Sequence, residues 1–165
     1  MESKTNKLIQ AISPEEIEQV FEIRTEVFVK EQKCLPSEEF DALDAVAKHY
    51  LLFEGNLPVA TGRYRKTEKG IKVERIATLE MARGKGYASV VVNHLIEEAV
   101  KEYPDCAYFY LHAQVSVMPL YSSLGFTAYG ETFIEADIVH QAMGLSVASQ
   151  ESLVASQESL VANRQ

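Results

Sequence analysis

The sequence contains few cysteines and no long apolar segment. Its two cysteines, Cys34 and Cys106, have no C-x-x-C spacing, so we expect free thiols in a reducing compartment. No segment approaches the roughly 20 apolar residues of a membrane-spanning helix. Residues 1–10 are polar and lack the apolar stretch of a signal peptide. These absences favour a cytoplasmic protein that has no membrane partner.

Basic residues and metal-binding patterns are scarce as well. The chain carries 16 Lys and Arg against 24 Asp and Glu, a formal net charge of -8, which argues against a broad nucleic-acid surface. No two of its four histidines have metal-ligand spacing on one helix face, so we expect no metal. A length of 165 residues with 47% hydrophobic residues fits one domain with a real core.

The most informative segment that is present is RGKGYA, residues 83–88. It lies between a strand-like run, residues 71–79, and a helix-like run, residues 87–103. A glycine turn that opens a helix presents unpaired N–H groups and the positive end of the helix dipole, which together can bind a phosphate. Arg83 and Lys85 add positive charge. A plain turn beside a helix is common too, so both interpretations stay open for this segment alone.

Periodicity and turn residues predict an α/β fold. Ser13, Pro14 and Glu16 form a capping-box pattern at the start of a helix. Gly55-Asn56 is typical of a hairpin turn. Strands are predicted at residues 7–11, 49–54, 58–66, 71–79 and 107–113, helices from Pro14, Tyr87 and Pro119, and a closing hairpin from residues 126–135 and 138–143. A strand–helix–strand order across residues 71–113 implies a parallel pair with a right-handed crossover. The sheet is therefore mixed and mostly antiparallel.

The C-terminal segment has a different character. The seven residues ASQESLV, residues 148–154, are repeated without change as residues 155–161. Two heptads are too few to define a coiled coil, so we expect a fraying helix or a disordered tail, with a docking helix as the alternative. The predicted organisation is a domain at residues 1–143 followed by a heptad-repeat tail at residues 144–165.

Several motifs occur in one order along the chain. Arg83, Gly86 and Ala88 match the pattern Arg/Gln-x-x-Gly-x-Gly/Ala. The supporting segments are residues 24–32 (RTEVFVKEQ), 73–79 (VERIATL), 113–114, 121–126 (YSSLGF) and 139–143 (VHQAM). Together they resemble the GCN5-related N-acetyltransferase (GNAT) superfamily, and residues 24–32 are similar to its ElaA-like branch.

This resemblance implies a GNAT fold, whose central mixed sheet has a splayed fourth and fifth strand pair and is flanked by helices. It also implies acetyl-CoA as co-substrate, and no metal. The backbone of the fourth strand would pair with the pantetheine arm, and amides of the glycine turn would hold the diphosphate. The implied cofactor-binding residues are Ile76, Ala77, Thr78, Arg83, Gly84, Lys85, Gly86, Tyr87, Ala88, Ser89, Gln114 and Tyr121. Gln114 stands where many members have Asn.

The implied reaction is direct attack by a primary amine on the thioester in a ternary complex. Tyr121 matches the family's proton donor to the departing thiolate, although a tyrosine packed on the sheet would look the same. Glu74 is the first candidate base, with a raised pKa in an apolar pocket, unless it pairs with a neighbouring Lys or Arg. His140 is the rival base because histidine titrates nearest neutrality, and His112 and His49 are weaker rivals.

The acceptor side is assigned to Arg24, Glu31, Gln32 and Arg75, with Arg75 facing away from Glu74 by strand alternation. Arg24 fits a salt-bridge role equally well. The acidic residues 38–41 could attract a cationic amine, but a solvated loop is the preferred interpretation. The expected partner is a small-molecule or peptide amine, with no nucleic acid, and the protein is a monomer or homodimer. A non-catalytic acyl-CoA-binding regulatory module is the alternative function.

Overall fold

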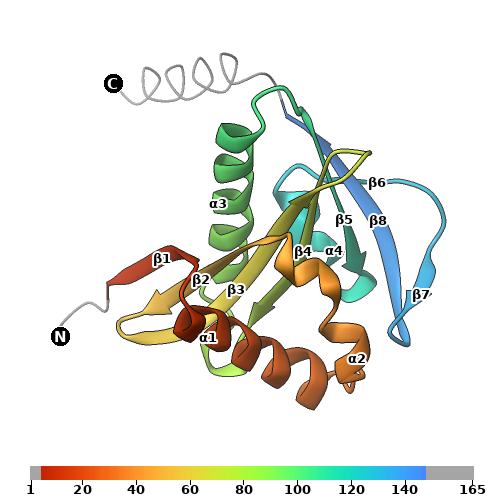
Figure 1. The fold of residues 1–165 in the computed structure, drawn as a ribbon. Helices are drawn as coiled ribbons and strands as arrows, with labels where there is room; N and C mark the ends of the chain where they lie inside the picture. Colours follow the sequence, from red (N-terminus) through yellow and green to blue (C-terminus); the bar gives the residue numbers. More distant parts are fainter. Residues whose placement is uncertain (1–4, 148–165) are drawn as a thin grey trace.

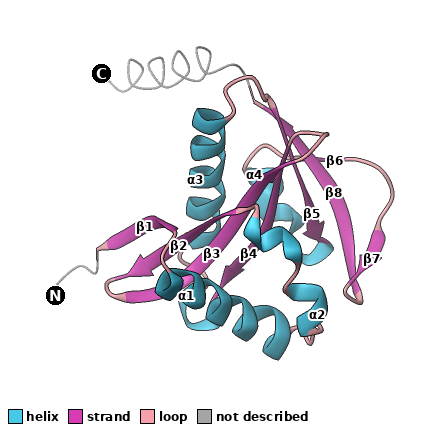
Figure 2. Ribbon diagram, in the orientation of Figure 1, coloured by secondary structure: helices cyan, strands magenta, loops and turns pink. Residues whose placement is uncertain are grey.

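The computed structural model describes residues 5–147, which form one open eight-stranded sheet with helices on both faces (Figures 1 and 2). The strands are β1 (Asn6–Ala11), β2 (Lys48–Glu54), β3 (Leu57–Lys66), β4 (Ile71–Thr78), β5 (Tyr108–Gln114), β6 (Thr127–Ala128), β7 (Phe133–Glu135) and β8 (Ile138–Ser146). The α-helices are α1 (Pro14–Arg24), α2 (Pro36–Glu39), α3 (Tyr87–Glu102) and α4 (Met118–Ser123). A π-helix, η1 (Thr25–Glu31), continues α1 without a break.

Strands β1 to β4 form an antiparallel meander, and β4 then pairs with β5 in parallel through the crossover helix α3. This confirms the predicted α/β fold with a mixed, mostly antiparallel sheet. The β4–β5 pairing involves only Ile71 with Phe109 and Lys72 with Tyr110. Beyond Lys72 the two strands have no ladder between them, and this opening creates the main cavity of the protein.

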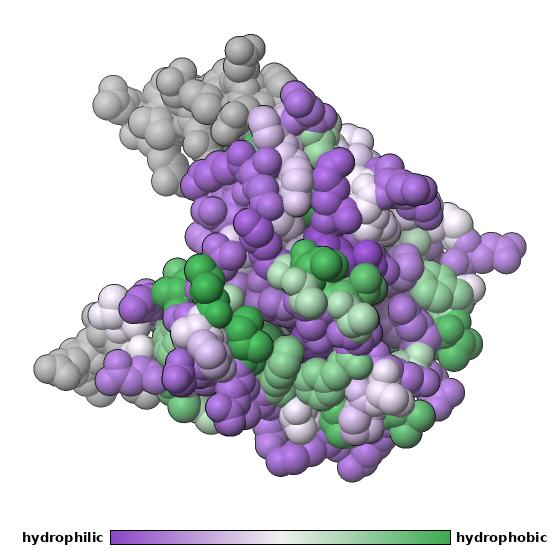
Figure 3. All heavy atoms as spheres, in the orientation of Figure 1, coloured by the Kyte–Doolittle hydropathy of each residue, from purple (hydrophilic) through white to green (hydrophobic). Residues whose placement is uncertain are grey.

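The sheet has a hydrophobic layer on each face. Alternation along β2 sends Leu52 to the layer beneath α3 and Leu51 to the layer beneath α1. Val91 and Leu95 of α3 are fully buried on the first face. The opposite side of α3 is largely hydrophilic, which is the expected pattern for a helix that covers a sheet (Figure 3).

Strand β4 contains a bulge in front of the open region. Thr61 pairs with Ala77 and Arg63 pairs with Glu74, so Arg75 and Ile76 together stand opposite the single residue Gly62. Arg75 has a φ of 58°, a conformation that non-glycine residues rarely adopt. A Cβ on residue 62 would lie 2.6 Å from the Ile76 Cδ1 and 2.8 Å from the Val91 Cγ1, so any larger residue opposite the bulge would require these side chains to shift.

The first helix begins as predicted and ends differently. The Ser13 hydroxyl accepts from the Glu16 N–H, and the Glu16 carboxylate accepts from the Ser13 N–H, which completes the capping box. The helix predicted from Pro14 has α-helical bonding only as far as Arg24, and a wider π-helix carries Phe28. The π-helix is the step that sequence periodicity did not reveal.

The closing hairpin is also more broken than predicted. The run from 126 to 135 forms two short strands, β6 and β7, and both pair with β8. Strand β8 runs to Ser146, past the boundary suggested at residue 143. The heptad repeat lies outside the described residues.

A buried ion network joins the end of α1 and residues 39–44 to strand β3 of the sheet. The Arg24 side chain is fully buried, and its guanidinium contacts the Glu39 carboxylate at 2.8 Å and the Asp44 carboxylate at 2.7 Å. Arg63, which is 1% exposed, also pairs with Asp44. The preferred interpretation of the acidic run as a solvated loop is therefore wrong for Glu39, which is 5% exposed. These carboxylates are partners of buried arginines.

Replacing Arg24 with methionine is expected to destabilise the fold by about 3 kcal/mol, because the buried Glu39 and the half-buried Asp44 would lose the cation that they share. Urea unfolding measures this difference. Lys30→Met is the matched control, since Lys30 pairs with Glu26 on the exposed side of η1 and should cost less than about 0.5 kcal/mol. Equal effects from the two substitutions would contradict the network's role.

Candidate active site

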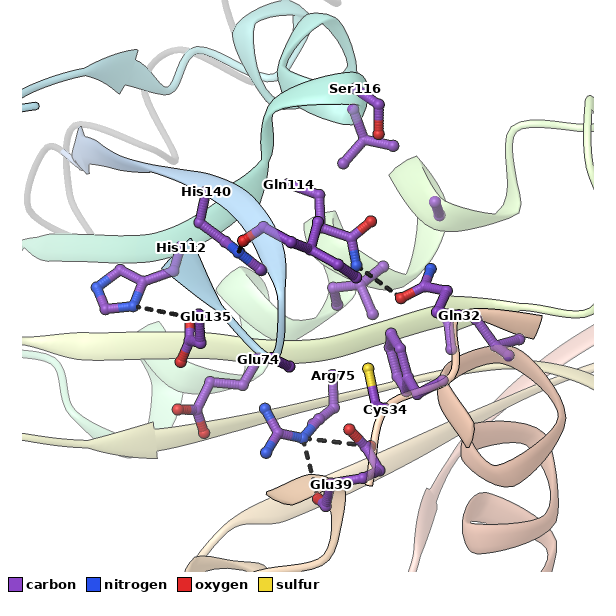
Figure 4. A pocket seen from close by; sticks show the side chains of 18 of the residues that line it. Gln32, Cys34, Glu39, Glu74, Arg75, His112, Gln114, Ser116, Glu135 and His140 are labelled. Carbon is purple, nitrogen blue, oxygen red and sulfur yellow. Dashed lines mark hydrogen bonds and ion pairs between the residues drawn. The ribbon is translucent and has the colours of Figure 1, made fainter. Parts of the chain in front are cut away.

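The cavity between the splayed strands has a volume of about 760 Å³ (Figure 4). One wall comes from β4, a second from β5 and β8, and a third from η1 and α2. The residues proposed from the sequence that line it are Glu31, Gln32, Glu74, Arg75, Ile76, Ala77, Thr78, Arg83, Ala88, Gln114, Tyr121 and His140. Arg24 does not line it and is fully buried in the ion network, so its assignment to the acceptor side was wrong.

The glycine turn has the geometry of an anion site. Gly84 and Gly86 have φ values of 79° and 80°, and a Cβ built on either would meet no atom within 4 Å. The first helical hydrogen bond of α3 runs from the Val90 N–H to the Gly86 C=O. The amides of Tyr87, Ala88 and Ser89 therefore have no carbonyl partner within the helix. An open approach and unpaired donors fit a diphosphate group.

The two basic side chains of this turn are already paired. Lys85 contacts the Glu54 carboxylate at 2.8 Å, and the Tyr87 hydroxyl donates to the same carboxylate. Arg83 donates to both carboxylate oxygens of Glu31. The turn thus offers backbone donors toward the open space, while its side chains fix its position against β2 and η1.

Tyr121 projects from α4 and is 7% exposed. Burial raises the pKa of its phenol to about 12. Its ring meets the ring of Phe126 edge-on, with centroids 6.1 Å apart. The phenol therefore stays protonated at any physiological pH and can act as a proton donor.

Glu74 is not the raised-pKa carboxylate that the sequence suggested. Burial alone would raise its pKa, but hydrogen bonds from Arg65 and the charges of Arg63 and Lys72 lower the pKa to about 2. The nearest cation contacts are Arg63 at 2.8 Å, Arg65 at 2.9 Å and Lys72 at 3.1 Å. The alternative, a carboxylate paired with neighbouring cations, describes it correctly, and Glu74 is half-buried.

Arg75 does not face away from Glu74 as simple alternation predicted. Both residues line the cavity, because the bulge breaks the alternation of β4 at this point. The Arg75 guanidinium contacts Glu39 at 3.2 Å and Asp41 at 3.4 Å. Arg75 therefore belongs to the cavity wall and to the buried ion network together.

The wall formed by β5, β7 and β8 carries groups that can transfer protons. The Nδ1 of His140 lies 2.7 Å from the Ile138 carbonyl oxygen, which can only accept, so Nδ1 carries the proton. The neutral ring then presents Nε2 as its basic atom. His112 Nδ1 lies 3.6 Å from the Glu135 carboxylate, and this contact lowers the pKa of Glu135. Sequence reasoning missed Glu135. Strand alternation places Glu135 on the same face of the hairpin as Phe133, and this pattern could have identified it.

The remaining candidates lie elsewhere or carry no sign of activation. His49 is 4% exposed and contacts the Asp44 carbonyl oxygen at 2.9 Å, outside the cavity. His94 is half-buried, and its ring meets the Tyr50 ring edge-on. Cys34 lines the cavity, but burial and then the Glu39 and Glu38 carboxylates raise the pKa of its thiol. Neither cysteine forms a disulfide.

Comparison with known proteins identifies the fold and the class of enzyme. Residues 8–147 match the family described as an acetyltransferase (GNAT) domain. A Bacillus subtilis protein named as the uncharacterised N-acetyltransferase YjcF is 33% identical over 83% of this chain and 97% of its own length. The chain belongs to the GNAT family and is an acyltransferase.

Solved structures agree with this assignment. A Pseudomonas aeruginosa acyl-CoA N-acyltransferase superimposes with a TM-score of 0.76 and 28% identity, over 86% of this chain and 99% of that chain. Escherichia coli ElaA shares the fold, with a TM-score of 0.73 and 24% identity over 85% of this chain and 97% of its own. The resemblance inferred from the motifs is confirmed.

Two further findings concern the described residues alone. No helix among residues 5–147 is long and apolar enough to cross a membrane. In the same range there is no group of three or more His, Cys, Asp or Glu side chains that could hold a metal ion.

The lowered pKa of Glu74 predicts how the stability of the protein depends on pH. A carboxyl whose pKa is depressed in the folded state contributes stability above its unfolded pKa, and loses that contribution as the pH falls toward its folded pKa of about 2. Glu74→Gln should therefore cost about 3 kcal/mol at pH 7 and less than half of that at pH 3. Urea unfolding at the two pH values checks this, with the exposed Glu97→Gln as control. A cost that does not change with pH would refute the assignment.

Proposed function

We propose that the protein transfers an acetyl group from acetyl-CoA to a primary amine of a small molecule or peptide, by direct attack in a ternary complex. The observation that carries the proposal is the arrangement of one cavity. Ala88, from the glycine turn, lies at its lining, and the same lining holds a protonated phenol, Tyr121, and an imidazole, His140. One end of the proposed anion site thus opens into the same cavity as a candidate proton donor and a candidate proton acceptor.

The residues present fit the cofactor. Amides from Arg83 to Ser89 would hold the diphosphate, and the bulged backbone of Ile76 to Thr78 would pair with the pantetheine arm as an added strand does. When bound, acetyl-CoA supplies an acyl group activated as a thioester. Pairing along the open edge of β4 would direct that group toward Tyr121 and His140, which lie on the far side of the splay.

Proton transfer is then divided between two residues. Tyr121 donates its proton to the departing sulfur, a role for which a protonated phenol held in a buried position is suited. His140 accepts the proton of the attacking amine at Nε2, because its Nδ1 proton is held by Ile138. Glu74 is a poor base at neutral pH, since its three cationic partners stabilise the ionised form. We assign to Glu74 the role of neutralising Arg63, Arg65 and Lys72 at the wall of the cavity.

The glycine turn provides a direct test of cofactor binding. Gly86→Glu should weaken acetyl-CoA binding by more than about tenfold, because it places a carboxylate beside the unpaired amides. Isothermal titration calorimetry measures the dissociation constant. Gly130→Glu is the matched control, since Gly130 also has a positive φ, 71°, and open space at its Cβ position but lies between β6 and β7, away from the start of α3. Loss of binding in both variants, or in neither, would count against the site.

The catalytic step is tested by the release of CoA thiol across a panel of amines. Tyr121→Phe should lower turnover roughly 100-fold while leaving the acetyl-CoA dissociation constant within about twofold, because only the transferable proton is removed. Tyr129→Phe on the exposed surface controls for loss of a phenol. Unchanged turnover in Tyr121→Phe refutes the acid role. Binding of acetyl-CoA with no amine-dependent thiol release identifies a regulatory module instead.

A further inference from the structure

The motif residues Glu31 and Gln32 were expected on the acceptor side, yet their contacts lead elsewhere. Each bonds a residue that the family resemblance implies at the cofactor: Glu31 bonds Arg83, and Gln32 bonds Gln114. We propose that Gln32 is a positioning residue for the cofactor arm, which it orients through Gln114. This inference rests on the proposed function, because it assumes that the arm enters the cavity between β4 and β5.

The Gln32–Gln114 hydrogen bond crosses the cavity. Gln32 follows η1 on one wall, and Gln114 is the last residue of β5 on the other (Figure 4). The Gln114 Nε2 donates to the Gln32 Oε1 over 2.8 Å. In this arrangement the Gln114 amide turns its nitrogen toward Gln32, so its Oε1 remains available to accept from an amide N–H in the cavity. Pantetheine contains such N–H groups.

Gln114 lies beside the proposed base, so the orientation of its amide affects where the arm is held. Gln114 pairs directly with His140 across the β5–β8 ladder, and directly opposed side chains lie on the same face of a sheet. An arm bonded to Gln114 is therefore held beside the proposed base. Without a partner, the Gln114 amide could rotate between two orientations that present a donor or an acceptor to the arm.

The π-helix explains how Gln32 reaches this position. The Gln32 N–H donates to the Val27 C=O over 3.2 Å, which is the five-residue spacing of a π-helix. Next to it, Glu31 accepts from the Arg83 Nη2 with both oxygens at 2.9 Å, while the Arg83 Nε donates to the Thr78 C=O at 3.0 Å. The end of η1 is thus tied both to the glycine turn and to the end of β4. Gln32 projects from a fixed point.

Two variants of equal size separate the hydrogen bond from packing. Gln32→Leu keeps the volume and removes the acceptor oxygen, whereas Gln32→Glu keeps an acceptor toward Gln114. Calorimetry should show acetyl-CoA binding roughly 3- to 10-fold weaker in Gln32→Leu, the range expected for one hydrogen bond, and within about threefold of the parent in Gln32→Glu. A second ligand, 3′-phosphoadenosine 5′-diphosphate, carries the diphosphate without the arm. Its binding should be unchanged in both variants.

The route through Gln114 is tested by a double-mutant cycle. In a Gln114→Ala background, Gln32→Leu should cause no further loss of acetyl-CoA affinity, because the residue it orients is already gone. An additional loss there, equal losses for both ligands, or no loss in Gln32→Leu would each overturn the inference while leaving the proposed function intact. If the parent protein binds neither ligand, the proposed function itself fails, and the inference fails with it.

Discussion

The short pairing between β4 and β5 is the constraint from which the rest of the site follows. The two strands share a ladder only at Ile71–Phe109 and Lys72–Tyr110, and then separate. Buried backbone groups need partners, so an open strand edge inside a protein favours an extended ligand that can supply them. The bulge at Arg75 and Ile76 turns the edge of β4 at this point. A cavity of about 760 Å³ is the consequence.

The bulge is held in place by charge as well as by the sheet. Arg75 adopts a φ of 58° while its guanidinium contacts Glu39 and Asp41. The Glu39 carboxylate also contacts Arg24 at the end of α1. One set of buried ion pairs therefore fixes the strand that would carry the cofactor arm and the helical wall that faces it. Such pairs contribute more to a defined geometry than to net stability, since desolvation offsets much of their attraction.

Local sequence signals were sufficient for the succession of strands from β1 to β4, the capping box, the crossover helix and the glycine turn, because each depends on residues close together in the chain. The charge state of Glu74 depends on Arg63 and Arg65, which lie on the neighbouring strand and contact it only through the β3–β4 register. The direction of Arg75 depends on the extra residue of the bulge, which strand periodicity does not reveal. Gln32 was recognised as part of a motif, but its partner is 82 residues away.

The two walls of the cavity differ in the groups that they offer to a ligand. On the β4 side, Glu74 and Arg75 are each held by ion pairs, so what this wall offers a ligand is backbone. On the opposite side, β5, β7, β8 and α4 present the side chains of His112, Glu135, His140 and Tyr121 to the cavity. The acidic net charge of the chain is thus a poor guide to the acceptor, because the buried acidic residues are matched by arginines. The second wall is where the proposed proton transfers would take place, because it carries the His140 imidazole and the Tyr121 phenol.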